Sequence, residues 1–205
     1  MAQVQVGGKL VVVGLGDSIT AGNPGWDPDP VRRLSEGDDP TSQYLYWAAR
    51  ADPRLETRNH GVGGERTDEI LMRFDEAVTG ADVLIVQGGI NDIVQGLAPE
   101  VAIEHLRTMV RRAKERGLGV LLPDVLPWNN GWPDAEPRIR RLNELIRALG
   151  AAEHVKVLPF HDTLEDPERP GRMRDNLTPD GNHPSVEGHR LLGERAFSLP
   201  DAFRA

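Results

Sequence analysis

Cysteine is absent from the sequence. Disulfide scaffolds, thiolate zinc sites, iron–sulfur clusters and cysteine nucleophiles are thereby excluded. Long apolar runs are missing as well, and the longest near the N-terminus, Leu10–Val13, is too short for a signal peptide or a membrane span. We therefore expect a cytoplasmic protein that inserts into no membrane, with an export signal already removed as the alternative.

Positive charge is scarce relative to negative charge. Lysine and arginine total 24 against 32 aspartates and glutamates, which gives a formal net charge of −8. Such an acidic chain lacks the electrostatic surface of a general nucleic-acid-binding protein or of a polybasic membrane-surface protein. Its 205 residues, 39% of them hydrophobic, suit one domain spanning residues 1–205 and leave the oligomeric state open.

Short apolar runs predict five buried strands. Continuous runs of this length are typical of strands covered on both faces, as in a parallel sheet. The predicted strands are Leu10–Leu15, Leu55–Asn59, Val83–Val86, Leu118–Leu122 and Val155–Leu158. Proline and glycine concentrate in residues 23–40, 123–137 and 166–184, which we expect to be loops.

Helical periods separate the apolar runs. Apolar residues recur at steps of three and four from Val101 to Ala113 and from Ile139 to Leu149. Further helices are predicted at Thr41–Ala51, Thr67–Ala77 and Val186–Ala196. Because strands that alternate with helices form βαβ units, we expect a three-layer α/β sandwich around a flavodoxin-like, five-stranded parallel sheet.

Polar clusters follow three of the predicted strands, and a fourth precedes the last helix. They are Gly16–Thr20, Asn59–Gly64, Gly88–Asp92 and Asp180–Pro184. Ligands of a doubly wound sheet bind beyond the carboxyl ends of its strands, and every cluster falls at that edge. Each cluster alone reads as an ordinary turn or helix cap, but their convergence indicates one active site.

The residue types in these clusters suit acyl transfer through a serine. Ser18 stands at a strand-to-helix junction, where a helix N-terminus favours developing negative charge. A serine needs a base within hydrogen-bond reach, which His183 can supply. Asp180, three residues earlier, can accept the imidazole Nδ1–H and fix the tautomer. Asp17 beside the nucleophile is expected to hold the turn through hydrogen bonds.

An oxyanion formed during acyl transfer needs hydrogen-bond donors. We expect these donors to be the Ser18 N–H, the Gly64 N–H and the side-chain amide of Asn91. Glycine suits the second position because it lets the backbone approach a substrate closely. Gly61 and Gly63 compete with Gly64 for that role.

Other function classes fit less well. A dinucleotide-binding turn needs a third glycine where Ile19 stands, and neither the P-loop nor the G-x-S-x-G pattern occurs. Gly16–Asp17, Gly181–His183 and Gly188–His189 superficially resemble segments of two-metal phosphoesterases, but that ligand set is incomplete. We expect no metal and no cofactor. A catalytically silent binding module is the non-enzyme alternative, although no member of the expected triad is missing.

The clusters together resemble the four sequence blocks of the SGNH hydrolases, the GDSL esterase/lipase family. Gly16–Ile19 resembles the nucleophile block, with isoleucine in place of leucine. Gly64 falls at the oxyanion glycine, Gly89–Asp92 resembles the G-x-N-D block, and Asp180–His183 resembles the D-x-x-H block. The resemblance spans residues 9 to about 196, and it implies the roles given above and a sheet in the order 2-1-3-4-5.

The resemblance implies a cofactor-independent carboxylic ester hydrolase acting on a small-molecule ester. Two indoles, Trp128 and Trp132, follow the fourth predicted strand, where they can wall a substrate pocket or simply pack the loop. Their segment Leu126–Gly131 resembles lysophospholipase-like and arylesterase-like bacterial members. No long hydrophobic lid is obvious, which favours short acyl chains. Thioesterase, lysophospholipase and carbohydrate O-deacetylase activities are the alternatives.

Overall fold

A parallel sheet of five strands forms the centre of the protein in a computed structural model that describes residues 8–203. The strands are β1 (Leu10–Gly16), β2 (Leu55–Gly61), β3 (Val83–Val86), β4 (Gly119–Pro123) and β5 (Lys156–Leu158). They are hydrogen-bonded in the order β2-β1-β3-β4-β5. All four pairings are parallel, and the register sets Leu10 opposite Leu55 and Val12 opposite Val83. The expected fold class and strand order are confirmed.

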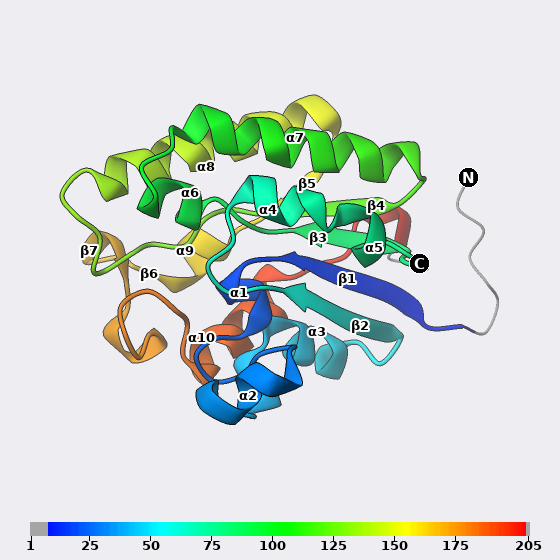
Figure 1. The fold of residues 1–205 in the computed structure, drawn as a ribbon, viewed down its shortest axis with the longest axis horizontal. Coiled ribbons are helices and arrows are strands. Elements are labelled where there is room, and N and C mark those ends of the chain that lie inside the picture. Colours follow the sequence, from blue (N-terminus) through cyan, green and yellow to red (C-terminus); the bar gives the residue numbers. More distant parts are fainter. Residues whose placement is uncertain (1–7, 204–205) are drawn as a thin grey trace.

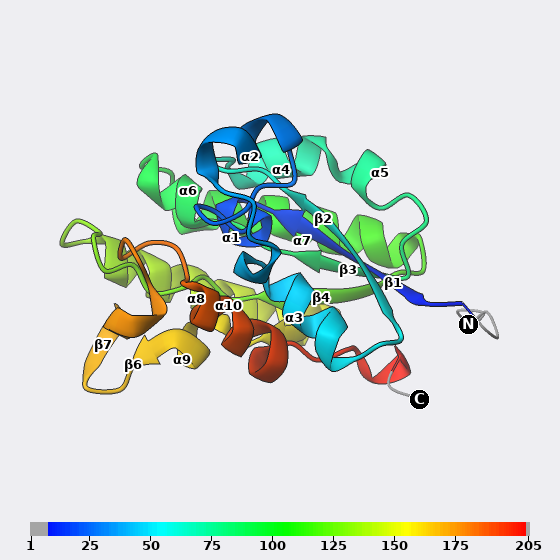
Figure 2. The same cartoon turned by 90° about the horizontal axis from the view of Figure 1, so that it is seen from below.

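Helices cover both faces of the sheet (Figures 1 and 2). One face carries α4 (Thr67–Met72), α5 (Phe74–Ala77), α6 (Ile90–Val94), α7 (Pro99–Glu115) and α8 (Ala135–Glu153). The other carries α3 (Tyr44–Ala51), α9 (Phe160–Leu164) and α10 (Val186–Leu191), the last continuing as a π-helical turn at Leu192–Ala196. Two short helices, α1 (Ser18–Ala21) and α2 (Pro30–Glu36), and a hairpin of β6 (Glu165–Asp166) and β7 (Arg169–Met173) lie outside these layers. No helix within residues 8–203 is long and apolar enough to cross a bilayer.

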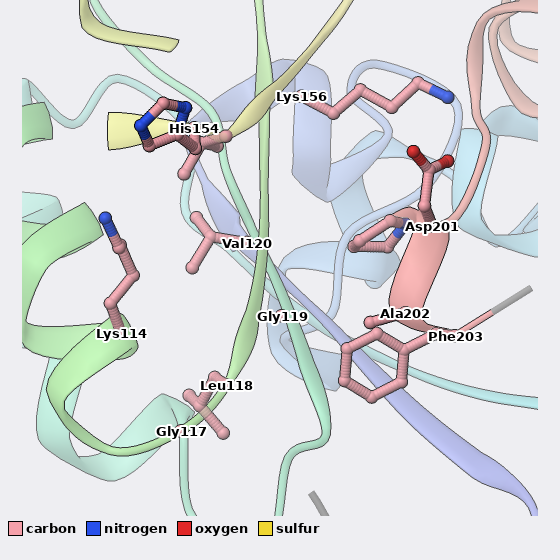
Figure 3. Close-up of a pocket in the computed structure, with 12 residues that line it drawn as sticks. Lys114, Gly117, Leu118, Gly119, Val120, His154, Lys156, Asp201, Ala202 and Phe203 are labelled. Atoms are coloured by element: carbon pink, nitrogen blue, oxygen red, sulfur yellow. The ribbon is translucent and has the colours of Figure 1, made fainter. Parts of the chain in front are cut away.

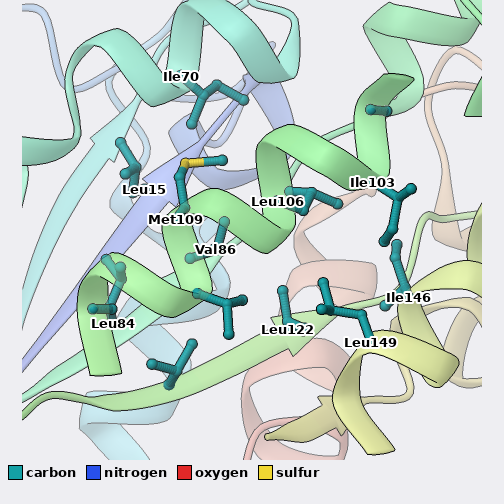
Figure 4. Packing of buried hydrophobic residues seen from close by; sticks show 14 of the residues in the cluster. Leu15, Ile70, Leu84, Val86, Ile103, Leu106, Met109, Leu122, Ile146 and Leu149 are labelled. Carbon is teal, nitrogen blue, oxygen red and sulfur yellow. The ribbon is translucent and has the colours of Figure 1, made fainter. Parts of the chain in front are cut away.

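The core is divided in two by the alternation of side chains along each strand. Leu84 and Val86 of β3 enter the core under α7 and α8, whereas Val83 and Ile85 enter the core under α3 and α10. The first core is closed by helical residues at steps of three and four, shown in Figure 4, among them Ile103, Leu106, Met109, Ile146 and Leu149. Because β1, β3 and β4 are buried on both faces, their sequences are almost continuously apolar.

The helix expected at Thr67–Ala77 is in fact two helices. Arg73 interrupts it with φ −91° and ψ 0°, and its N–H donates to Ile70 O at 3.2 Å, which tightens the last turn of α4 before α5 begins. The apolar period continues across the break, so the sequence pattern alone does not reveal it. The Arg73 guanidinium donates to backbone carbonyls at the carboxyl ends of β1 and β2.

Two of the expected loops contain secondary structure. Residues 23–40 include α2, which begins where the Asp29 carboxylate accepts a hydrogen bond from Val31 N at 2.8 Å. Its apolar side chains Val31 and Leu34 are 71% and 88% exposed, so α2 has no buried stripe and lacks the pattern by which helices are predicted. Residues 166–184 include β7, and the two-stranded pairing of β6 with β7 is too short to show a period.

Asp124 joins the carboxyl ends of β4 and β5. It is 4% exposed, its Oδ1 accepts a hydrogen bond from His161 N at 2.7 Å, and its own N–H donates to Leu158 O at 3.1 Å. Burial raises the pKa of Asp124 from 3.8 to about 6, and the hydrogen bond from His161 opposes that rise. The folded protein therefore binds this proton more tightly than the unfolded chain does.

We expect Asp124→Asn to remove a pH-dependent part of the stability. A raised carboxyl pKa stabilises the fold fully below about pH 4, and this contribution is lost as pH rises through about 6. Asparagine still accepts the His161 N–H but does not titrate. The free energy of unfolding of the variant relative to the parent should therefore increase by up to about 3 kcal/mol between pH 4 and pH 7.

Chemical denaturation at several pH values measures this difference. Asp134→Asn, which changes an exposed aspartate at the start of α8, is the matched control for the same substitution outside the core. A pH-independent difference for Asp124→Asn itself would show that burial does not govern this carboxyl group.

Candidate active site

Ser18 opens α1 directly after β1, at the carboxyl edge of the sheet. The Asp17 carboxylate accepts a hydrogen bond from Ile19 N at 2.9 Å and so caps the helix, while Gly22, with φ 108°, ends it after four residues. Ser18 is 8% exposed. The short helix therefore fixes the serine at a sharp turn, with little freedom to move.

Buried polar groups support this turn from below. The Asp17 N–H donates to Gln87 Oε1 at 3.2 Å, and the Thr20 hydroxyl donates to the same oxygen at 2.8 Å. Burial raises the pKa of the Asp17 carboxyl to about 6, although the hydrogen bond from Ile19 N lowers it in part. Gln87 was not among the expected site residues, but its position directly after the apolar run of β3 was a signal for it.

His183 lies against Ser18 although 165 residues separate them. Its Nε2 is 3.0 Å from Ser18 Oγ, and its Nδ1 is 2.7 Å from Asp180 Oδ2. Asp180 Oδ1 also accepts hydrogen bonds from the backbone N–H groups of Asn182 and His183, each at 2.8 Å. Burial acts to raise the pKa of Asp180, but these hydrogen bonds outweigh it and hold the pKa below its ordinary value. The carboxylate is therefore charged at neutral pH.

The Asp180–His183 turn is closed by a threonine. Thr178 Oγ1 accepts a hydrogen bond from Gly181 N at 2.8 Å and donates to His183 O at 2.7 Å. Gly181 has φ 79°, a left-handed conformation that favours glycine. The resulting order of groups, hydroxyl to imidazole to carboxylate, is the arrangement by which a serine is deprotonated for nucleophilic attack.

Asn91 lies in the first turn of α6, which follows β3 at the carboxyl edge of the sheet. Its Nδ2 donates to Glu65 O at 2.9 Å, which uses one of the two N–H groups of the amide and leaves the second for another acceptor. The next residue, Asp92, is fully buried and accepts hydrogen bonds from Thr67 N at 3.0 Å and Thr67 Oγ1 at 2.6 Å. Burial raises the pKa of Asp92, and the bonds from Thr67 lower it. Asp92 thus ties α6 to α4 and fixes the direction of Asn91.

The structure reduces the number of glycines whose N–H could stabilise the oxyanion. The Gly61 N–H is not available to a substrate, because it already donates a hydrogen bond to Asn59 Oδ1 at 2.9 Å. Within residues 8–203, by contrast, neither the Gly63 N–H nor the Gly64 N–H has an acceptor. Gly63 lies beside the nucleophile, since a Cβ built on it would be 3.8 Å from Ser18 Cβ, whereas Gly64 has φ 84° and open space around it. These two glycines remain the candidates.

Arg73 and Glu65 form a support for this loop that sequence analysis missed. Arg73 Nη2 lies 2.6 Å from Glu65 Oε2, and the same guanidinium donates to His60 O at 3.0 Å and Gly16 O at 3.3 Å. The guanidinium therefore links the ends of β1 and β2 to the residue whose carbonyl receives Asn91. No sequence signal distinguishes this pair, because the two residues lie eight apart in a loop and a helix end.

A narrow pocket borders Ile19 and Asn182, the residues next in sequence to Ser18 and His183. Its free volume is about 10 Å³, close to that of one water molecule. It is lined by Ile19, Gln87, Ile90, Val125, Leu126, Pro127, Trp128 and Asn182. Trp132 is not part of the lining; it is 37% exposed and packs edge-on against Trp128, with ring centroids 5.1 Å apart. The two expected indoles are thus neighbours, but only Trp128 borders the pocket.

A larger hollow of about 780 Å³ lies elsewhere, as Figure 3 shows. Its lining comes from the residues that precede or begin β4 and β5, together with the C-terminal turn, and includes Lys114, Gly119, His154, Lys156 and Phe203. Because parallel strands begin at one edge of a sheet and end at the other, this hollow lies at the opposite edge from Ser18. None of the residues expected in the active site contributes to it.

One group of side chains could hold a metal ion. Ligand atoms of His161, Asp162 and Glu165 lie within 4.8 Å of one another at the junction of α9 and β6. Asp162 is exposed, and Glu165 Oε1 already accepts a hydrogen bond from Gly171 N at 2.6 Å, which holds the β6–β7 hairpin. None of these residues belongs to the clusters that converge on Ser18.

His189, from the G-H segment considered for metal binding, is enclosed in the protein. It is fully buried, and within residues 8–203 neither ring nitrogen has a hydrogen-bond partner. Burial lowers the pKa of His189 to about 3, and the charge of His183 acts in the same direction. The ring is therefore a neutral core side chain that adds no positive charge beside His183.

Comparisons with known proteins identify the family of this chain. Residues 15–191 match the model of the GDSL-like lipase/acylhydrolase family. The chain is 29% identical over 195 residues to esterase TesA of Pseudomonas aeruginosa, covering 92% of this chain and 85% of that one.

Solved structures share the fold at lower identity. A putative lipolytic protein of the G-D-S-L family from Desulfitobacterium hafniense is 23% identical with a TM-score of 0.75, covering 91% of this chain and 97% of that one. A mutant of Axe2, an acetyl xylan esterase from Geobacillus stearothermophilus, is 18% identical with a TM-score of 0.73, covering 92% and 93%. The family match extends over most of the sequence and includes every cluster at the carboxyl edge of the sheet. The chain therefore belongs to the GDSL-like lipase/acylhydrolase family and is a carboxylic ester hydrolase.

Proposed function

We propose that the protein hydrolyses short-chain carboxylic esters through an acyl-enzyme formed on Ser18. The observation that carries this proposal is the continuous hydrogen-bonded series from Ser18 Oγ to His183 Nε2 at 3.0 Å and from His183 Nδ1 to Asp180 Oδ2 at 2.7 Å. Both distances are within hydrogen-bond range, so proton transfer needs no rearrangement of these side chains.

In the first half of the reaction, Ser18 Oγ attacks the ester carbonyl while His183 Nε2 accepts the hydroxyl proton. Asp180 stabilises the resulting imidazolium and holds its ring in place. The tetrahedral intermediate then breaks its bond to the alcohol oxygen, which takes the proton from Nε2 and leaves as the free alcohol. In the second half, water repeats these steps on the acyl-enzyme, and the carboxylic acid and free Ser18 are released.

The negative charge of each tetrahedral intermediate falls on the former carbonyl oxygen. We assign its stabilisation to the Ser18 N–H, the free amide N–H of Asn91 and the Gly64 N–H, with Gly63 as the competing donor. The open space and left-handed backbone at Gly64 support the first choice, and the closeness of Gly63 to Ser18 supports the second. Donors of this kind are effective because they are already oriented before charge develops.

The size of the apolar pocket supports a preference for small acyl groups. Ile19, Ile90, Leu126 and Trp128 line a space of about 10 Å³, so any acyl group that enters has to displace part of this wall, and a longer alkyl chain has to displace more of it. We place the acyl group of the substrate against Trp128 in this pocket. Trp132 then acts by packing against Trp128 rather than by touching the acyl group.

We expect Ser18→Ala to lose ester hydrolysis while keeping its fold. The substitution removes the nucleophile, and the alanine methyl group fits the space of the serine side chain. Hydrolysis of p-nitrophenyl acetate with and without EDTA measures the effect, and circular dichroism checks the fold. Activity that survives in Ser18→Ala but disappears with EDTA would instead indicate metal-dependent hydrolysis.

We expect Asn91→Ala to lower kcat by about 10²–10³-fold, since it removes one oxyanion donor. The variant should fold, because Asn91 is only partly buried and its neighbour Asp92 still ties α6 to α4. Gln95→Ala, which removes an exposed amide one turn further along, is the matched control and should retain kcat. A kcat for Asn91→Ala within a few-fold of the parent would remove Asn91 from the oxyanion site.

We expect turnover to fall as the acyl chain lengthens. Esters of p-nitrophenol with acetyl, butanoyl, octanoyl and dodecanoyl groups differ only in the part that must enter the pocket beside Trp128. Acetate and butanoate should give the highest kcat/KM. Faster hydrolysis of the dodecanoyl ester than of the butanoyl ester would show that the acyl chain binds elsewhere.

A further inference from the structure

The loop between β4 and α8 is bonded directly to the turn that carries Asp180 and His183. The Asn129 N–H donates to Gly181 O at 2.7 Å, and Asn130 Nδ2 contacts Asp180 O at hydrogen-bond distance. These contacts join two segments that lie 50 residues apart in the sequence. The carbonyl groups of Asp180 and Gly181 are therefore held by this loop rather than by the sheet.

The Asn130 amide is seated closely on the turn. A backbone carbonyl can only accept a hydrogen bond, so the atom of Asn130 that meets Asp180 O must be the amide nitrogen. A Cβ built on Gly181 would lie 2.6 Å from Asn130 Oδ1 and 2.8 Å from Asn130 Cγ. The side-chain amide thus occupies the space that any larger residue at position 181 would need.

The loop itself is anchored away from the active site. Asn129 Nδ2 donates to Met173 O at 3.0 Å, and Asn129 Oδ1 accepts from Met173 N at 2.7 Å, which fastens the loop to β7. Met173 is fully buried in the core under α3 and α10. Asn129 therefore supplies a rigid base, from which Asn130 reaches the turn.

We infer that Asn130 is a positioning residue, whose side chain holds the Asp180–His183 turn so that the imidazole stays in line with Ser18. This inference rests on the proposed role of His183 as the base. Asn130 touches neither Ser18 nor the His183 ring; it acts through the Asp180 carbonyl and the Gly181 backbone. Neither contact was evident from the sequence, in which the segment was noted for its two indoles and for its resemblance to lysophospholipase-like and arylesterase-like members.

A shift of this turn affects the reaction because the hydrogen bonds that join Asp180, His183 and Ser18 are short and directional. Asp180 is exposed and receives the imidazole from the same turn, so His183 has little support from the core. A displacement of about 1 Å between catalytic groups can cost about 100-fold in rate. Asn130 is exposed, so replacing it changes the turn without opening the core.

The test compares Asn130→Ala and Asn130→Asp with the parent. Both remove the N–H donor, and aspartate keeps the shape of asparagine, which separates hydrogen bonding from packing. Asn176→Ala is the matched control: it changes an exposed asparagine in the segment leading to the same turn, and its side chain has no hydrogen bond within residues 8–203. The readouts are kcat and KM for p-nitrophenyl acetate, and the hydrogen exchange rates of the Gly181, Asn182 and His183 amides.

We expect both Asn130 variants to lower kcat by about 10- to 100-fold, with KM changed by less than about threefold. The three amides, whose bonds to Thr178 and Asp180 depend on the turn, should exchange at least about fivefold faster. Asn176→Ala should change neither. Unchanged exchange, full kcat in either Asn130 variant, or a rise in KM at constant kcat would overturn the inference. If the parent hydrolyses no ester, the proposed function fails, and the exchange rates alone decide the positioning role.

Discussion

The active site depends on the place of β1 between β2 and β3. The chain leaves β1 toward α3 on one face and leaves β3 toward α7 on the other, so a crevice opens between their carboxyl ends. α1 fits this crevice because glycines flank it. A Cβ at Gly16 would lie 2.4 Å from Thr20 Oγ1, and a Cβ at Gly61 would lie 2.1 Å from Ala21 N. The close approach of α1 to Gly16 and Gly61 therefore constrains the position of Ser18 on steric grounds alone.

Buried polar groups then make this placement specific. Asn59 Nδ2 donates to Thr20 O at 2.7 Å, which satisfies a carbonyl at the end of α1, and the Asp17 carboxylate caps its start. A buried polar group without a partner is costly in a low-dielectric interior, so alternatives to this arrangement are disfavoured. The charge of His183 also lowers the pKa of Asp17, which means that an imidazolium favours the ionised carboxyl.

Sequence patterns predicted the strands and the clusters of polar residues at one sheet edge. They did not reveal the short helix α2 or the side-chain contacts that form only in the folded protein. Apolar runs located all five strands to within two residues. For β1, β3 and β4 the reason is burial on both faces, which leaves little choice of residue. Ser18, Asn91 and the Asp180–His183 turn were predicted to converge at one edge of the sheet, and the structure brings Ser18 Oγ and His183 Nε2 to 3.0 Å from each other. The ion pair of Arg73 with Glu65 was not predicted from the sequence. The Arg73 guanidinium donates to the carbonyls of His60 and Gly16, and these become neighbours only when β1 pairs with β2. α2 was missed because it buries no apolar stripe.

Ser18 and His183 are supported by different parts of the structure, and the loop that supports His183 also forms a wall of the pocket. Ser18 and Asn91 start helices at the ends of central strands, whereas His183 lies in a turn held by the loop before α8. The same loop carries Trp128, the wall of a pocket only about 10 Å³ in volume. An acyl group bound in that space, as we propose, has to displace Trp128, and the next two residues along the backbone hold Gly181 and Asp180. The proposed acyl site and the turn that carries His183 are therefore connected through only two residues, Asn129 and Asn130, so that a movement of the pocket wall is expected to reach the imidazole.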